Sequence, residues 1–156
     1  MFDAPVDTWY LWLGVATASA VAFGVAISLP STVPPDAERA AATVDAVATS
    51  PHNATGEHAL DATAVKLGSR RLAFRNEGGT THASVAYGPV TPVRTGTDLA
   101  AVLRGTPPAV VFENASALAT AAESARNRTR TWRETDGRLV VRRLSWEGID
   151  VTLVGV

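Results

Sequence analysis

Four side chains that can ligate a divalent metal lie close together in the chain: His52, Glu57, His58 and Asp61. Imidazole and carboxylate form a ligand set that suits zinc and related ions. The two histidines are six positions apart in a stretch without a helical period, so nothing in the sequence brings them to one point. A metal site needs defined geometry. We therefore interpret the stretch as a solvated polar loop without a metal.

A second pair, His82 and Ser84, has the residue types of a hydroxyl and its general base. In a strand, residues two apart are separated by about 7 Å, whereas proton transfer needs about 3 Å. The sequence also contains no Gly-rich phosphate loop, no nucleophile elbow and no His-Glu-x-x-His run. We therefore predict no catalytic residue, no cofactor and no enzymatic activity.

The strongest charge cluster lies between residues 126 and 143 and contains Arg126, Arg128, Arg130, Arg133, Arg138, Arg142 and Arg143. Only Glu134 and Asp136 oppose these arginines locally, and Trp132 and Trp146 lie among them. Such a patch can bind phosphates, anionic lipid headgroups or an acidic partner. Alternatively, the acidic stretch 36–61 neutralises it within the protein. A net charge of −1 argues against nucleic acid as a partner.

Three asparagines stand in N-x-S/T triplets, at Asn53, Asn114 and Asn127. These triplets are glycosylation acceptors and favour a domain outside the cytoplasm. Asn114 also fits a helix N-cap, which would engage its side-chain oxygen. Asn53 is the best acceptor because it lies in a predicted loop.

An uncharged run from Trp9 to Leu29 contains 21 residues. As a helix it would be about 31 Å long, which matches the hydrocarbon thickness of a bilayer. Aromatic residues mark its start and Pro30 its end. Residues 1–8 form a short polar N-terminus without Lys or Arg, unlike the start of a signal peptide. The sequence therefore predicts a transmembrane helix over residues 9–29 that serves as an uncleaved signal anchor.

Small residues recur every four positions in this run, at Gly14, Ala18, Ala22 and Ala26. Such a stripe allows another helix to pack closely, so we expect other membrane proteins as partners beside the lipid bilayer. The first arginine after the run is Arg39, and basic residues tend to stay inside. This signal opposes the acceptor triplets. We give the triplets more weight and predict a single-pass protein with an extracytoplasmic C-terminal domain.

Residues 30–35 read as a Pro-rich spacer, and residues 36–156 as a soluble domain. Asp36 can cap an amphipathic helix of about 13 residues, and Ser50 to Asp61 reads as a loop. A second helix is predicted after Thr97 and a third after Asn114, ending near Arg126. Residues 109–112 fit either a strand or the lead into that third helix. Six strands are predicted: Ala64–Leu67, Arg71–Arg75, Thr81–Tyr87, Thr131–Glu134, Leu139–Trp146 and Ile149–Val156.

Asp136-Gly137 and Glu147-Gly148 read as hairpin turns between the last three strands. The strands come in two groups with helices between them rather than in strict alternation with helices. The predicted fold class is therefore α+β: an N-terminal transmembrane helix followed by a small domain of mostly antiparallel strands with two or three short helices. The absence of cysteine excludes disulfides and thiolate metal sites.

Lys66 is the one lysine among 14 basic residues, a bias typical of GC-rich genomes. With the apolar run and the Pro-rich spacer, the chain resembles a family of small single-span haloarchaeal proteins of unknown function. The matching segments are residues 1–10 (MFDAPVDTWY), 88–93 (GPVTPV), 103–108 (LRGTPP) and the Trp-containing ending from Val140 to Gly155. The resemblance implies membrane anchoring and assigns no activity.

Two functions fit these expectations. The first is a membrane-anchored structural or accessory component of a cell-envelope assembly, which is pilus- or secretion-like by architecture only. The alternative is a membrane-tethered ligand-binding or sensory domain. An assembly subunit would associate with several proteins, whereas a sensor would respond to its ligand.

Overall fold

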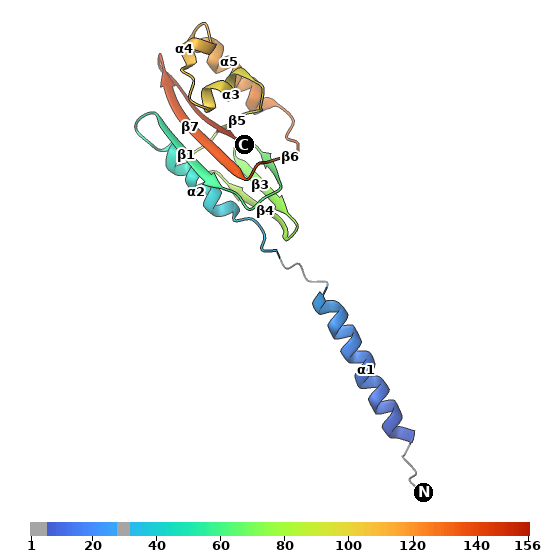
Figure 1. Cartoon of the computed structure of the whole chain (residues 1–156). Helices are drawn as coiled ribbons and strands as arrows, with labels where there is room; N and C mark the ends of the chain where they lie inside the picture. Colours follow the sequence, from blue (N-terminus) through green and yellow to red (C-terminus); the bar gives the residue numbers. More distant parts are fainter. Residues whose placement is uncertain (1–5, 28–31) are drawn as a thin grey trace. The chain divides into compact units, whose positions relative to one another are not determined.

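The computed structural model describes residues 6–27 and 32–156, which belong to two separate compact units (Figure 1). Within these residues the fold is α+β, with five helices and two four-stranded sheets. The α+β prediction is confirmed. Most of the predicted polar N-terminus and the first residues of the predicted spacer lie outside the described residues.

The first unit contains α1, Val6–Ile27. The predicted transmembrane helix over residues 9–29 is wrong: within residues 6–27 and 32–156, no helix combines the length and the apolar character that a membrane crossing requires. The prediction rested on the absence of charge, which does not by itself provide the apolar character that a membrane crossing requires.

The end of the predicted spacer is part of the second unit. The Thr81 hydroxyl donates a hydrogen bond to the Pro35 carbonyl at 2.7 Å, and the Asn76 amide donates to the Val33 carbonyl at 2.9 Å. Helix α2, Ala37–Ala48, follows, and the Asp36 carboxylate caps it by accepting from the Arg39 amide. The predicted helix and its cap are confirmed. Its apolar face is buried: Ala37, Ala40, Ala41, Val44, Val47 and Ala48.

One sheet has the strand order β4-β3-β2-β6. Its strands are β2 (Ala64–Leu67), β3 (Arg71–Asn76), β4 (Gly79–Ser84) and β6 (Arg133–Glu134). All of its pairs are antiparallel. The predicted meander of the first three strands is confirmed, although β4 begins and ends earlier than expected. As a result, Tyr87 lies beyond the sheet and is exposed.

The other sheet has the order β1-β7-β8-β5. Its strands are β1 (Ala54–Ala59), β5 (Thr91–Pro92), β7 (Arg138–Trp146) and β8 (Ile149–Gly155). Strand β7 pairs antiparallel with β1 and β8, and β5 pairs parallel with β8. The predicted Glu147-Gly148 hairpin is confirmed, and both turn residues have positive φ angles of 47° and 82°.

Two predictions about this sheet are wrong. Residues 54–59 form β1 rather than a loop, because β7 supplies their hydrogen-bonding partner. The Asp136-Gly137 turn joins no hairpin: β6 before it pairs with β2 in one sheet, while β7 after it pairs with β1 in the other. The turn therefore transfers the chain between the two sheets.

Three helices lie between β5 and β6 in the sequence: α3 (Asp98–Leu103), α4 (Pro108–Val111) and α5 (Ala115–Asn127). The Asn114 side chain caps α5 by accepting from the Ala117 amide at 2.9 Å, as the sequence predicted. Residues 109–112, for which the sequence allowed a strand or the lead into a helix, lie mostly in the short helix α4. Figure 1 shows these helices gathered beside β7 and β8.

The sheet that contains β7 separates two apolar clusters. On one face, Leu139, Val141 and Val154 pack with α2 and with residues of the other sheet. On the opposite face, Leu144 and Leu153 pack with α3 and α5. Because alternate residues of a strand point to opposite faces, β7 contributes to both clusters. This arrangement decides which arginines of the C-terminal cluster meet.

Candidate functional site

The structure divides the seven clustered arginines into two groups. Four of them make contacts that support the fold: Arg126, Arg138, Arg142 and Arg143. The other three line one small pocket: Arg128, Arg130 and Arg133. The predicted patch for an anionic partner is therefore spread over two settings, and its role stays a prediction.

Arg142 and Arg143 are neighbours on β7 and point to opposite faces of the sheet. Arg143 donates a hydrogen bond to the carbonyl of Ala48, the last residue of α2. Arg142 donates to the carbonyl of Val102, in the last turn of α3. A helix C-terminus has free carbonyls and a partial negative charge, which a cation stabilises. These two arginines therefore hold a helix against each face of the sheet.

Arg126 and Arg138 are also engaged. Arg126, in the last turn of α5, donates to the hydroxyl of Thr91, a fully buried side chain, at 3.4 Å. Arg138 forms an ion pair with Glu57 on the adjacent strand β1 at 3.5 Å, and both side chains are largely exposed. An exposed pair of this kind contributes little to stability.

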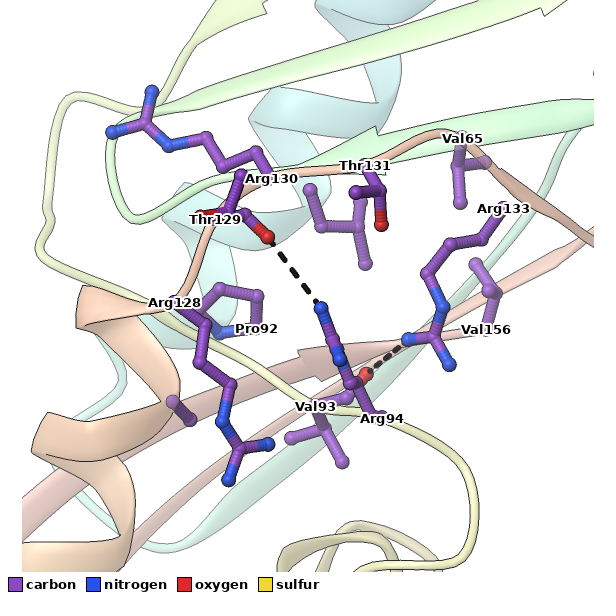
Figure 2. A pocket seen from close by; sticks show the side chains of 12 residues that line it. Val65, Pro92, Val93, Arg94, Arg128, Thr129, Arg130, Thr131, Arg133 and Val156 are labelled. Atoms are coloured by element: carbon purple, nitrogen blue, oxygen red, sulfur yellow. Dashed lines mark hydrogen bonds between the residues drawn. The ribbon is translucent and has the colours of Figure 1, made fainter.

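The arginine pocket lies where the edges of the two sheets meet the end of α5 (Figure 2). Arg128 and Arg130 follow α5, and Arg133 begins β6. A fourth arginine, Arg94, enters the pocket from the segment after β5. The rest of the lining is apolar or carries a hydroxyl: Val65, Leu67, Pro92, Val93, Ala125, Thr129, Thr131 and Val156. The pocket encloses about 30 Å³, so it accommodates a small polar group.

Arg94 and Arg133 are the central pair. Figure 2 shows their guanidinium groups close together, with Arg128 and Arg130 directed toward the rim. Arg133 donates to the Val93 carbonyl at 3.4 Å, and Arg94 donates to the Thr129 carbonyl at 3.5 Å. Each guanidinium has five N–H donors, so most donors of this pair are left for a ligand.

The electrostatics of the pair are unfavourable in the absence of a ligand. Partial burial lowers the pKa of Arg133, and the charge of Arg94 lowers this pKa further. Arginine remains protonated at any physiological pH, so both groups stay charged. Two like charges thus remain near one another, with Arg133 partly buried and Arg94 exposed.

Little negative charge compensates the pocket. The ion pairs formed by residues 32–156 are Arg39–Asp36 and Arg138–Glu57, and neither involves a pocket arginine. The C-terminal end of α5 contributes a partial charge of about −0.5, against four full positive charges. Trp132, which the sequence placed among these arginines, contacts Arg75 instead: the Arg75 guanidinium carbon lies 4.6 Å from the centre of the Trp132 ring.

Sequence reasoning missed Arg94. This residue lies 32 positions before Arg126, in a segment between Pro92 and Gly96 that carries no strand or helix pattern. The parallel pairing of β5 with β8 brings it to the pocket, and parallel neighbours distant in sequence leave no local signal.

The polar residues near β1 do not form a metal site. Glu57 and His58 are adjacent on the strand and therefore point to opposite faces, while the His58 Nδ1 lies 3.3 Å from the Thr43 hydroxyl. His52 is exposed in the preceding turn. No group of three potential ligands occurs in the part of the chain that the structure describes. His82 and Ser84 are both exposed on β4, and no hydrogen bond joins them.

The three acceptor asparagines lie in different settings. Asn114 uses its side-chain oxygen in the α5 cap, and Asn127 is the last residue of α5. Asn53 is exposed before β1, where its Oδ1 accepts from the Ser145 amide at 2.8 Å. A glycan at Asn53 stays a prediction.

Two members of the predicted small-residue stripe, Gly14 and Ala18, lie on the exposed surface of α1. No atom lies within 4 Å of the position that a Gly14 side chain would occupy. The side chains of Ala22 and Ala26 lie outside the described residues. The stripe therefore stays a prediction.

A protein-family model matches residues 3–144, and its description is Family of unknown function (DUF7283). Since the match covers most of the chain, the chain belongs to this family. No curated protein and no solved structure matches the chain. The expected resemblance to a family of unknown function is confirmed.

Proposed function

We propose that this member of DUF7283 binds a small anion in its arginine pocket. Ligand binding is one of the two functions that fit the sequence, and we propose it here for the domain of residues 32–156. The single observation that carries it is the placement of Arg94 and Arg133 in one pocket, where neither forms an ion pair with a carboxylate of the described residues. Guanidinium groups bind phosphate, sulfate and carboxylate through paired N–H donors.

An anion between these groups would replace a repulsion by two attractions. Two unit charges 4 Å apart interact by about 4 kcal/mol at the effective dielectric of a protein surface, and by about 1 kcal/mol in water. Part of this energy is lost when the anion gives up its hydration. Arg128 and Arg130 at the rim favour approach of the anion rather than its fixed orientation.

The competing interpretation is an ordinary solvated cluster of surface arginines. Such a cluster responds to ionic strength, and sulfate then stabilises the protein only through its general exclusion from the surface. A binding pocket responds to sulfate or phosphate beyond this general effect. The two interpretations are therefore separable by experiment.

The experiment is thermal unfolding of the full chain in sodium sulfate and in sodium chloride at equal ionic strength. Sulfate at ten times its dissociation constant stabilises by about 1.4 kcal/mol and raises Tm by about 3–6 °C. Arg133→Gln should lose most of the sulfate-specific gain and keep only the general stabilisation that excluded sulfate gives to any protein. Arg39→Gln is the matched control, because Arg39 is exposed on α2 away from the pocket. Equal Tm values of the wild type in both salts would contradict the proposal.

A second candidate is the accessory role in a cell-envelope assembly. It is supported by large apolar side chains of α1 that are more than half exposed, among them Trp9, Leu11, Trp12 and Leu13. In this role α1 would associate with copies of itself. The double variant Trp9→Gln, Leu13→Gln changes one helical face, and sedimentation velocity should show oligomers of the full chain that this variant loses. Monomers in both cases would exclude this second role.

The haloarchaeal origin and the extracytoplasmic location of the domain stay predictions. The first is supported by the preference for arginine over lysine. The second is supported by the exposed position of Asn53. Intact-mass measurement of the native protein, compared with an Asn53→Gln variant, would detect a glycan at this site.

A further inference from the structure

A groove of about 550 Å³ lies beside the arginine pocket. Its lining includes residues of β1, β7 and β8 of one sheet and of α3. Its floor includes Val140 and Gly155, and α3 borders it with Ala100 and Leu103. The arginine pocket has room only for the anionic group of a ligand, whereas the groove has the size of sites that hold small organic molecules.

The groove and the arginine pocket adjoin one another. Val93 and Val156 line both. Val93 is held firmly, because its amide donates to the Val154 carbonyl at 2.8 Å and its own carbonyl accepts from Arg133 at 3.4 Å. One ligand can therefore contact Arg133 and the groove across the same valine.

The two cavities differ in charge. The arginine pocket has four positive charges and no acidic lining residue. The groove is lined by two acidic and two basic side chains, Glu57, Asp136, Arg104 and Arg138, so its formal charge is zero. A ligand that matches both cavities has an anionic head and an uncharged body.

From this complementarity we infer that the ligand is an organic phosphate, with its phosphate group in the arginine pocket and its uncharged body in the groove. The inference rests on the proposed function, since it assumes that the pocket binds an anion. It adds the class of ligand and the residues that contact the body. Inorganic phosphate then occupies only part of the site.

The test compares inorganic phosphate with phenyl phosphate by calorimetric titration of the full chain. Phenyl phosphate should bind at least fivefold more tightly to the wild type. Thr55→Trp places a large ring over the groove from the exposed edge strand β1 and should remove this gain while leaving inorganic phosphate unchanged. Thr80→Trp is the matched control, because Thr80 is an exposed strand residue on β4 of the other sheet.

Each outcome has a distinct meaning. If phenyl phosphate binds the wild type no more tightly than inorganic phosphate, the inference is wrong and the proposed anion site remains. If neither compound saturates a site, the proposed function itself fails. A gain that persists in Thr55→Trp also overturns the inference. Thr95→Trp, in the loop that borders the groove, replaces Thr55→Trp if that variant unfolds.

Discussion

Arg133 donates a hydrogen bond to the carbonyl of Val93, and Arg94 is the residue that follows Val93. The guanidinium of Arg133 therefore lies near the charge of Arg94. The segment Val93-Arg94 thus provides one of the two cations and holds the other through its backbone carbonyl. Such an arrangement costs free energy unless an anion joins it. The cost and its relief make the role of the pair measurable.

Arg94→Gln should not destabilise the protein in a buffer without multivalent anions. The substitution removes one of two adjacent like charges and only one long hydrogen bond, to the Thr129 carbonyl at 3.5 Å. The free energy of unfolding in urea should stay within about 0.5 kcal/mol of the wild type or rise. In sulfate the order should reverse, with the wild type more stable. A loss above about 1 kcal/mol without sulfate would mean that Arg94 is structural.

The pH dependence should come from the ligand and not from the protein. Arginine stays charged, and no histidine lines the pocket. A phosphate monoester loses one charge as the pH falls through its second pKa of about 6, so its affinity should fall there. Sulfate keeps both charges, and its affinity should stay constant. Calorimetry with glycerol phosphate and sulfate between about pH 5.5 and 8 spans the range in which histidine titrates. A sulfate affinity that changes over this range would reveal a titrating protein group.

The arginines of β7 should affect stability without affecting anion binding. Arg142→Gln and Arg143→Gln each remove a charged hydrogen bond to a helix C-terminus. Each should lower the free energy of unfolding by about 1–2 kcal/mol, while the sulfate-dependent increase in Tm remains. Arg138→Gln, at the exposed pair with Glu57, serves as the control and should cost less than about 0.5 kcal/mol. Loss of the sulfate response in the Arg142 variant would relocate the site.

Helices α2 and α5 and the hairpin of β7 and β8 could be predicted from the sequence. Asp36 and Asn114 cap the helices that follow them, and cap and helix are adjacent in the chain. The Glu147-Gly148 turn lies directly between its strands. Interactions of this range leave a pattern that can be read along the sequence.

Strand β1 could not be predicted in this way. Its inward positions carry Ala54, Gly56 and His58 rather than large apolar residues. Gly56 is needed because a side chain there would meet the Val47 methyl at 2.6 Å. The strand exists because α2 covers it and β7 pairs with it, which are tertiary causes.

The binding site was also only partly predictable. The sequence places the arginines close together, but the alternation of β7 directs Arg142 and Arg143 to opposite faces. Arg94 joins the site through a pairing between distant strands. The charge pattern therefore offered an anionic partner as one of two interpretations, while the choice of arginines for the candidate pocket required the fold.

Trp146 should contribute less to stability than its neighbour Leu144. Leu144 is 2% exposed in the cluster that packs on α3 and α5, whereas Trp146 is half-buried at its edge. Leu144→Ala should cost about 3 kcal/mol and Trp146→Ala about 2 kcal/mol. Chemical denaturation of both variants gives the comparison. A cost below about 0.5 kcal/mol for Trp146→Ala would mean that β7 does not extend to this residue.

The account depends most on where an anion binds, and arginine side-chain NMR of the full chain measures this directly. On titration with inorganic phosphate, the Nε–Hε signals of Arg94 and Arg133 should shift most and saturate together. Smaller shifts are expected for Arg128 and Arg130 at the rim, and none for Arg142 or Arg143. Shifts of equal size at pocket arginines and at the exposed Arg39, without saturation, would contradict the proposed site.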